Sequence, residues 1–222
     1  MSEYATEPVK GLPELLPAGE RMLWQGQPSW RALAIRAFHV RKIAVYFGLI
    51  LLWRLGSGWI EGSSLASAAA FVLWFLPVAV AAVAIPTLLA WLYARSTVFT
   101  ITNRRVVMRY GVALPWSLNL PYRTIQTAAM NVQNDGTADI AISLSGLGRI
   151  SYLHLWPFAR PWRINNAEPM MRALPDGRNV ADILARALQT FAETSPDRTV
   201  AMPVPVPVPA DSLATPATAA AA

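Results

Sequence analysis

The segment from residue 64 to residue 111 decides the fold, because the spacing of its apolar residues changes within it. Residues 64–93, SLASAAAFVLWFLPVAVAAVAIPTLLAWLY, contain no charged residue and are long enough to cross a bilayer as one helix. Residues 97–111, TVFTITNRRVVMRYG, have instead the composition of two strands joined by a tight turn at Asn103 and Arg104. This change predicts a membrane helix that leads directly into a β-hairpin.

A second apolar stretch precedes this segment. Residues 43–60, IAVYFGLILLWRLGSGWI, would rise about 27 Å as a helix, just enough for a hydrocarbon core of about 30 Å. Its single charge, Arg54, lies about 9 Å from the far end and can snorkel to the head groups. An intramembrane arginine can also pair with a carboxylate of a partner, and both interpretations stay open.

The stretch at 65–93 is longer than one span needs and too short for two. We expect one tilted helix, kinked at Pro77 or Pro86, and the alternative is a broken hairpin. Four Lys or Arg residues occur in 31–42 and four more in 95–109, whereas the connection between the spans has none. The positive-inside rule therefore predicts two crossings with both termini in the cytoplasm.

Only 14% of the residues are charged, against about 25% in ordinary soluble domains, and this favours membrane-embedded segments over a large soluble core. The sequence also lacks the residues and motifs of common catalytic sites. The absence of cysteine excludes disulfides and thiolate chemistry, and His39 and His154 are too far apart in sequence to indicate a metal site. A phosphate-binding loop and the common hydrolase motifs are also missing. We expect no enzymatic activity, no metal, no cofactor and no nucleic-acid partner.

The second half of the chain has the pattern of a β-meander. Six strands are expected in about sixty residues, the last of them in RISYLHLW at 149–156, with His154 as a packed or interfacial residue. A turn is predicted at NDGT, residues 134–137. A closing helix is expected after Pro175, and its apolar stripe consists of Val180, Ile183, Leu184, Ala187, Leu188 and Phe191.

Four parts of the chain follow from these patterns. Residues 1–29 form an extended N-terminal segment, and 30–94 contain a juxtamembrane helix and the two spans. Residues 95–194 form a cytoplasmic β-domain, and 195–222 form a Pro- and Ala-rich tail of low complexity that is expected to be disordered.

The end of the sixth predicted strand is rich in aromatic and arginine residues, the types that are enriched in interface hot spots. The stretch is RISYLHLWPFARPWRI, residues 149–164. We expect a surface that docks a protein partner or lipid head groups. Its residues are Trp156, Phe158, Arg160, Trp162 and Arg163, together with Arg104 and Arg105 of the hairpin turn.

The order of these elements resembles a known family. GERMLWQGQPSW at 19–30, a pair of spans, FTITNRRVVMRYG at 99–111 and a meander closed by a helix resemble the bacterial pleckstrin-homology-like (PH-like) proteins with membrane anchors. The resemblance implies an α+β membrane protein. It would combine a two-helix transmembrane hairpin with a bent, partly open antiparallel β-barrel of seven strands, capped by a C-terminal helix. The seventh strand would come from 157–165 or from 21–26.

Four longer blocks carry a closer resemblance, which spans residues 7–191. They are similar to the PuhB family of photosynthetic-complex assembly proteins. The blocks are EPVKGLPELLPAGERMLWQGQPSWRALAIRAFHVRKIAVYF (7–47), FTITNRRVVMRYGVALPWSLNLPY (99–122), ISYLHLWPFARPWRI (150–164) and EPMMRALPD (168–176).

This second resemblance implies a non-enzymatic assembly factor in the bacterial cytoplasmic or intracytoplasmic photosynthetic membrane. Its implied partners are reaction-centre and core light-harvesting polypeptides and membrane lipids, and self-association as a homodimer or higher oligomer is expected. The alternative function is a membrane-anchored PH-like scaffold that binds anionic lipid head groups through basic side chains.

Overall fold

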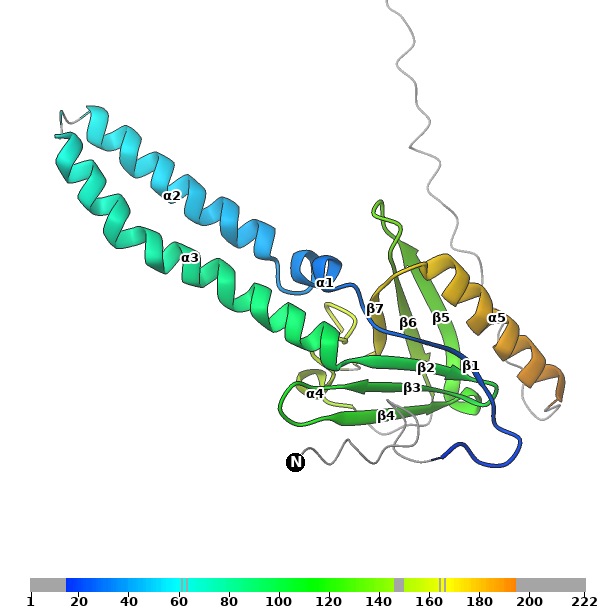
Figure 1. Cartoon of the computed structure of the whole chain (residues 1–222). Coiled ribbons are helices and arrows are strands. Elements are labelled where there is room, and N and C mark those ends of the chain that lie inside the picture. The colour runs from blue at the N-terminus through cyan, green and yellow to red at the C-terminus, as the bar shows by residue number, and fades with distance from the viewer. Residues whose placement is uncertain are drawn as a thin grey trace, which may run out of the picture.

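The protein consists of a long helical hairpin attached to a β-domain (Figure 1). The computed structural model describes residues 15–60, 62, 64–145, 150–163, 165 and 167–194. Most of the predicted N-terminal segment, residues 1–14, and the predicted tail from 195 onward lie outside the described residues.

Three helices make up the hairpin and its base. They are α1 (Trp30–Arg36), α2 (Val40–Ile60) and α3 (Leu65–Ser96). The expected juxtamembrane helix corresponds to α1, which ends at Arg36, and the chain turns at His39, whose φ is 54°, before α2 begins. Pro77 and Pro86 lie inside α3, which continues through both of them, so the broken-hairpin alternative is wrong.

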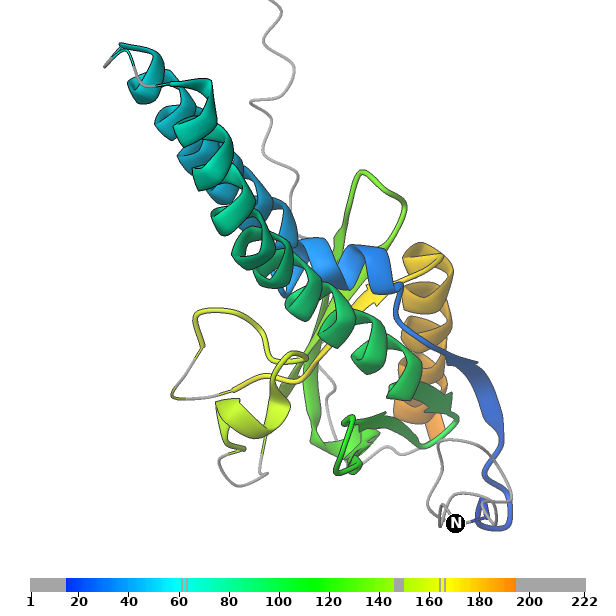
Figure 2. The ribbon, with the colours of Figure 1, turned by 60° about the vertical axis from the view of Figure 1, so that its left-hand side comes forward.

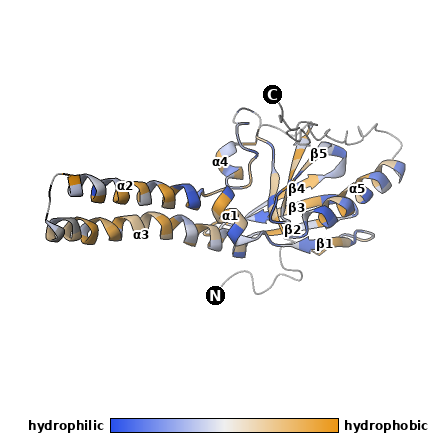
Figure 3. Cartoon of the chain, turned by 90° about the horizontal axis from the view of Figure 1, so that it is seen from above, coloured by the Kyte–Doolittle hydropathy of each residue, from blue (hydrophilic) through white to orange (hydrophobic). Residues whose placement is uncertain are grey.

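Both α2 and α3 are long and apolar enough to cross a membrane, by length and composition. Figure 3 shows hydrophobic colours along both helices, whereas α5 (Gly177–Thr194) has a hydrophilic and a hydrophobic side. Only 6% of the most apolar 18-residue window of each hairpin helix is buried inside the chain. The hairpin therefore leaves most of its apolar surface uncovered.

The described strands form two separate antiparallel sheets, so the predicted barrel is not closed. The first sheet has the order β1-β2-β3-β4, with β1 (Met22–Gly26), β2 (Val98–Thr102), β3 (Arg105–Tyr110) and β4 (Trp116–Pro121). The second has the order β5-β6-β7, with β5 (Ile125–Val132), β6 (Ala138–Leu144) and β7 (Met170–Leu174). The predicted α+β class and its antiparallel sheets are confirmed.

Local turn chemistry predicted two hairpins correctly. β2 and β3 pair around the turn at Asn103 and Arg104. β5 and β6 pair around the predicted NDGT turn, where Gly136 has a φ of 76°. That left-handed conformation is accessible to glycine at no steric cost, which explains its place in the turn.

The predicted sixth strand at 149–156 is wrong. Tyr152–Leu155 form a short helix, α4, which buries Leu155 completely. The helical turn brings Leu155 into the hydrophobic core, and this tertiary packing is not visible in the alternating sequence pattern. The sixth strand after the hairpin is instead β7, and β1 within 21–26 is the seventh strand.

The base of the hairpin and the β-domain share one hydrophobic core. Leu33 of α1 and Ala90 of α3 belong to the same buried cluster as Phe99 of β2. Helix α5 contacts the three strands of the second sheet and also β1 of the first, and Phe191 packs edge-on against Tyr122 with 5.6 Å between ring centroids. The hairpin is therefore fixed to the domain by packing and not by a linker.

An ionic cluster strengthens this attachment. Arg36 of α1 lies with Nη1 3.5 Å from Oδ2 of Asp139 on β6, and Oδ1 of Asp139 accepts a hydrogen bond from the N–H of Ala173 at 2.7 Å. The neighbouring Arg172 donates to the carbonyl of Pro157 at 2.9 Å. Burial lowers the pKa of Arg172, and the Asp139 carboxylate opposes that shift.

Candidate docking surface

Six exposed apolar side chains surround the base of the hairpin, and we call them the hairpin-end surface. They are Val112, Leu114, Trp116, Leu153, Trp156 and Trp162. In Figure 2, α4 and the yellow-green segment after it lie on the side of the domain from which the hairpin leaves. Three short segments contribute them: the β3–β4 turn with the start of β4, α4 with Trp156, and the loop at 160–168.

Strand register places the β3–β4 turn beside the hairpin. α3 ends at Ser96, and Val98, the first residue of β2, pairs with Arg109 near the end of β3. The turn that follows β3 therefore lies next to the end of α3. Leu114 at this turn is 73% exposed, and the ring of Trp116 meets His154 of α4 edge-on at 5.0 Å.

Trp156 connects the surface to the helices. Its ring stands edge-on to Phe38 at 5.1 Å and to Tyr93 of α3 at 5.9 Å between centroids. The side chain is nevertheless 40% exposed. Trp156 therefore has a structural role at the joint as well as an exposed edge.

Trp162 is the most exposed of the six, at 95%. Its φ of 66° lies in the left-handed region, which is uncommon for a bulky residue and is found where the surrounding structure enforces it. The sequence identified this tryptophan correctly as a surface residue. Its exposed indole is available to another molecule.

Glu168 holds the loop that carries Trp162. Its buried carboxylate pairs with Arg160 at 2.8 Å and with Arg163 at 3.1 Å, and Ser143 of β6 donates to it at 2.8 Å. The N–H of Arg160 also donates to the Glu168 carbonyl at 2.9 Å. Burial raises the pKa of Glu168, but the hydrogen bonds from Arg160 and Ser143 outweigh burial, so the pKa lies below its usual range.

Phe158 is not part of any exposed surface, which corrects its prediction as a docking residue. Its side chain is fully buried, edge-on to Phe99 at 5.4 Å and 5.7 Å from Tyr110. Burial depends on tertiary packing, so composition alone could not separate Phe158 from its exposed neighbours.

Arg104 and Arg105 lie away from the other predicted docking residues. They occupy the turn at the far end of β2, about 17 Å from its start for five residues of strand. Arg105 forms an ion pair with Glu20 at 2.8 Å, whereas Arg104 is exposed. The structure therefore does not bring these two arginines into the hairpin-end surface.

A polar hollow of about 310 Å³ lies near this far end. Arg21, Asn103 and Arg186 line it, with Ile183 and Thr190 of α5. Arg186 donates to the carbonyl of Asp182 within α5. The hollow is separate from the hairpin-end surface, and none of the six residues of that surface lines it.

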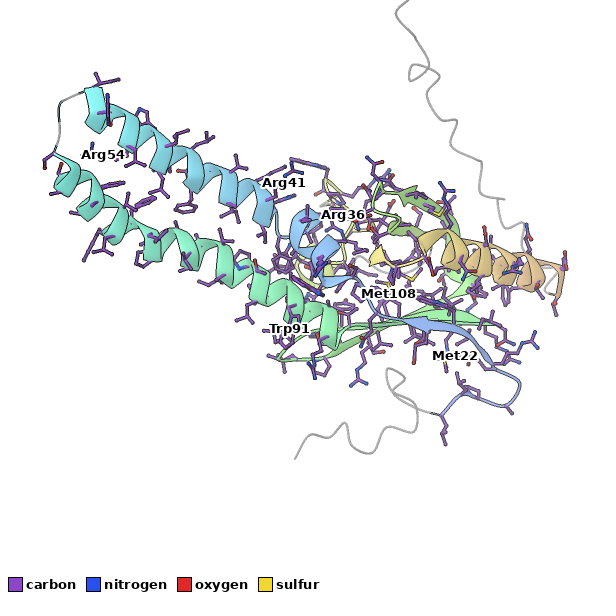
Figure 4. All side chains as sticks on the ribbon, turned by 45° about the horizontal axis from the view of Figure 1, so that its top comes forward. Met22, Arg36, Arg41, Arg54, Trp91 and Met108 are labelled. Atoms are coloured by element: carbon purple, nitrogen blue, oxygen red, sulfur yellow. The ribbon has the colours of Figure 1, made fainter. Side chains whose placement is uncertain are left out.

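Arg54 lies toward the loop end of α2, and Arg41 lies at the opposite end of that helix, beside the domain (Figure 4). The Arg54 guanidinium stands over the ring of Phe71 on α3, 5.3 Å from its centroid. This contact with an aromatic face stabilises the charge inside the hairpin.

An apolar groove of about 750 Å³ runs between α2 and α3 in the half of the hairpin next to the domain. Its walls contain small residues on both helices. The lining includes Ala44, Phe47, Gly48, Ala79, Val83 and Trp91. Small side chains allow another helix to approach closely in a membrane.

The described residues contain no group of three or more His, Cys, Asp or Glu placed to hold a metal ion. The main candidate sites in the described part are therefore two surfaces. They are the apolar groove on the hairpin and the hairpin-end surface around its base. Sequence reasoning missed four residues of the hairpin-end surface, which are Val112, Leu114, Trp116 and Leu153. The available signal was a pair of apolar residues in a turn, in VALP at 112–115, where polar residues are the rule.

Comparison with known proteins identifies a family and a relative of this chain. A model of the family described as "Bacterial PH domain" matches residues 39–188. An uncharacterized 23.7 kDa protein in the puhA 5′ region of Rhodobacter capsulatus is 35% identical over 203 residues, which cover 90% of this chain and 94% of that protein.

Among solved structures, a DUF1696 family protein with a pleckstrin-homology domain from Shewanella loihica is similar to this chain. The match is 14% identical and covers 43% of this chain and 70% of the other, with a TM-score of 0.29. That score is too low to carry an argument about this chain.

Proposed function

The chain belongs to the bacterial PH domain family, and we propose that it is a non-enzymatic, membrane-anchored factor that promotes assembly of the photosynthetic reaction centre and its core light-harvesting complex. In this proposal α2 and α3 cross the bacterial cytoplasmic or intracytoplasmic membrane. The β-domain and both termini lie on the cytoplasmic side.

One observation carries the photosynthetic part of the proposal. The 35% identical relative is described by its place in the puhA 5′ region, a neighbourhood that hints at photosynthesis. The match extends over 94% of that relative, so the two proteins correspond along almost their whole length. This agrees with the assembly family that the sequence blocks resemble.

The geometry supports action through contacts within the membrane. The apolar faces of α2 and α3 are largely uncovered by the rest of the chain, and the groove between them presents Gly48 and Ala79. We assign this groove to a transmembrane helix of a photosynthetic polypeptide, because small residues on both walls permit close helix packing, which a flexible lipid chain does not require. Self-association remains a prediction.

The alternative, recognition of anionic head groups as the main function, has weaker support in the geometry. Arg160 and Arg163 both pair with Glu168, and Arg105 pairs with Glu20. The exposed Arg104 lies at the end of β2 farthest from the hairpin. These positions do not converge on one basic site beside the membrane.

A mild-detergent purification of the tagged full chain from a phototrophic host tests the proposal. We expect reaction-centre or light-harvesting polypeptides to co-purify, and an absorption spectrum of the same sample reports whether pigment accompanies them. Deletion of the gene should lower the amount of assembled complexes. Normal levels of those complexes in the deletion strain would refute the proposed function.

A further inference from the structure

We infer that the hairpin-end surface inserts into the membrane–water interface of the bilayer that contains α2 and α3. The β-domain would then contact the membrane directly, and not only through the two helices. The ligand is the lipid bilayer itself, at the level of the head groups and upper acyl chains. The inference rests on the membrane anchoring in the proposed function and adds a defined orientation of the domain.

The position of the surface carries the first step. The register of β2 and β3 places Leu114 at the end of the domain where α3 enters, and Trp156 contacts Tyr93 in the last turns of α3. A bilayer that surrounds the hairpin must therefore come close to these side chains.

The rigidity of the joint carries the second step. A domain on a flexible linker would sample many orientations, and its apolar residues would face water for much of the time. Here Leu33, Ala90 and Phe99 share one core, and the Arg36–Asp139 pair connects α1 to β6. The angle between hairpin and domain is thus fixed, and the same six side chains always face the membrane.

The chemistry of the side chains carries the third step. Tryptophan is enriched at membrane–water interfaces, because its ring is apolar and its N–H can still reach water or head groups. Trp162 is 95% exposed, Leu153 85% and Leu114 73%, which is costly in water over several neighbouring loops. Arg41 at the start of α2 supplies positive charge at the end of the hairpin next to the domain (Figure 4).

The shape of the surface favours a bilayer over a protein. A protein partner is recognised through a complementary groove or pocket around anchor residues. The six side chains come instead from three separate segments around the hairpin base, and none of them lines the apolar groove or the polar hollow. Separate apolar protrusions suit a fluid, flat surface that adapts to each of them.

The chain contains no cysteine, which permits a direct test by single spin labels. Trp162→Cys and Leu114→Cys report on the hairpin-end surface. Val80→Cys on α3 reports on membrane insertion, and Glu193→Cys on α5 is the exposed control. Each labelled full-length variant is reconstituted into vesicles of phosphatidylcholine and phosphatidylglycerol, and its collisions with oxygen and with a water-soluble nickel chelate are measured.

We expect the labels at 162 and 114 to collide more often with oxygen than with nickel, at a shallower depth than the label at 80. The label at 193 should behave as in water. If the labels at 162 and 114 collide with oxygen and nickel as in water, while the label at 80 is inaccessible to nickel, the inference is overturned and the membrane anchoring stands. A water-like label at 80 would overturn both. Labels at 162 and 114 that are shielded from both reagents would indicate a protein contact and would also overturn the inference.

Discussion

The Glu168 carboxylate lies 2.8 Å from Nη1 of Arg160, and this pair joins the two ends of the loop that carries Trp162. The pKa of Glu168 is lowered in the folded protein from an ordinary value of 4.5. A carboxyl with a lowered folded pKa stabilises the structure above its unfolded pKa, and that contribution is lost as the pH falls through the folded pKa. The loop is therefore expected to stay ordered at neutral pH and to loosen below about pH 4.5.

The mobility of a spin label at Trp162→Cys, followed in detergent from pH 7 to pH 3, measures this loosening. In a Glu168→Gln background the label should be mobile at every pH, because the ion pairs with both arginines are absent. Equal label mobility at pH 7 in the Glu168→Gln variant and in the protein with Glu168 intact would show that the carboxylate does not hold the loop.

The two tryptophans of the hairpin-end surface should respond differently to truncation. Trp156→Ala removes the ring packed against Phe38 and Tyr93, and we expect a loss of about 2 kcal/mol in the free energy of unfolding, less than for a fully buried ring. Trp162→Ala should change that free energy by less than about 0.5 kcal/mol, because the side chain is 95% exposed. Denaturant unfolding of the full chain in detergent, followed by circular dichroism, compares them. Equal losses would mean that both rings are structural.

The secondary-structure elements that could be predicted from the sequence are those specified by neighbouring residues. The β2–β3 turn at Asn103 and helix α5 were predicted because turn residues and helical spacing are visible in a short window. The alternation from Ile150 to Trp156 matched a strand equally well, yet α4 forms there. The conformation of this segment depends on residues distant in sequence, such as Trp116, whose ring contacts His154 of α4.

The candidate site shows the same limit. Trp162 was identified by its type and by the two prolines that precede it, and it is exposed. Phe158, four residues earlier, was assigned the same role and lies in the core. Glu168 was not recognised, because its pairing with Arg160 and Ser143 joins elements that are separate in sequence. Residue type predicted which segment could form an interface. Tertiary packing determined which side chains of that segment are exposed.

The joint between hairpin and domain should depend on Asp139. Replacing it by asparagine removes the salt-bridge partner of Arg36 and the carboxylate that opposes the shift of the Arg172 pKa, in a mostly buried site. Loss of one partner of a buried pair costs about 3–5 kcal/mol, and we expect Asp139→Asn to fall near the lower end. Asp182→Asn on exposed α5 is the matched control and should be neutral. Thermal unfolding in detergent measures both, and a neutral Asp139→Asn would show that the core alone fixes the joint.

The groove between α2 and α3 should be the contact for a partner helix, and two glycines of α2 provide a matched test. A Cβ at Gly48 or at Gly56 would meet no other atom within 4 Å, so leucine fits at both positions without a clash at Cβ. Only Gly48 lines the groove. Gly48→Leu should therefore fill it and lower the yield of co-purified photosynthetic polypeptides about tenfold, which corresponds to about 1.4 kcal/mol. Gly56→Leu makes the same chemical change outside the groove and should leave that yield unchanged. Equal yields from both variants, at equal expression, would exclude the groove as the contact. The outer faces of the hairpin would then be the candidate contact for a partner helix.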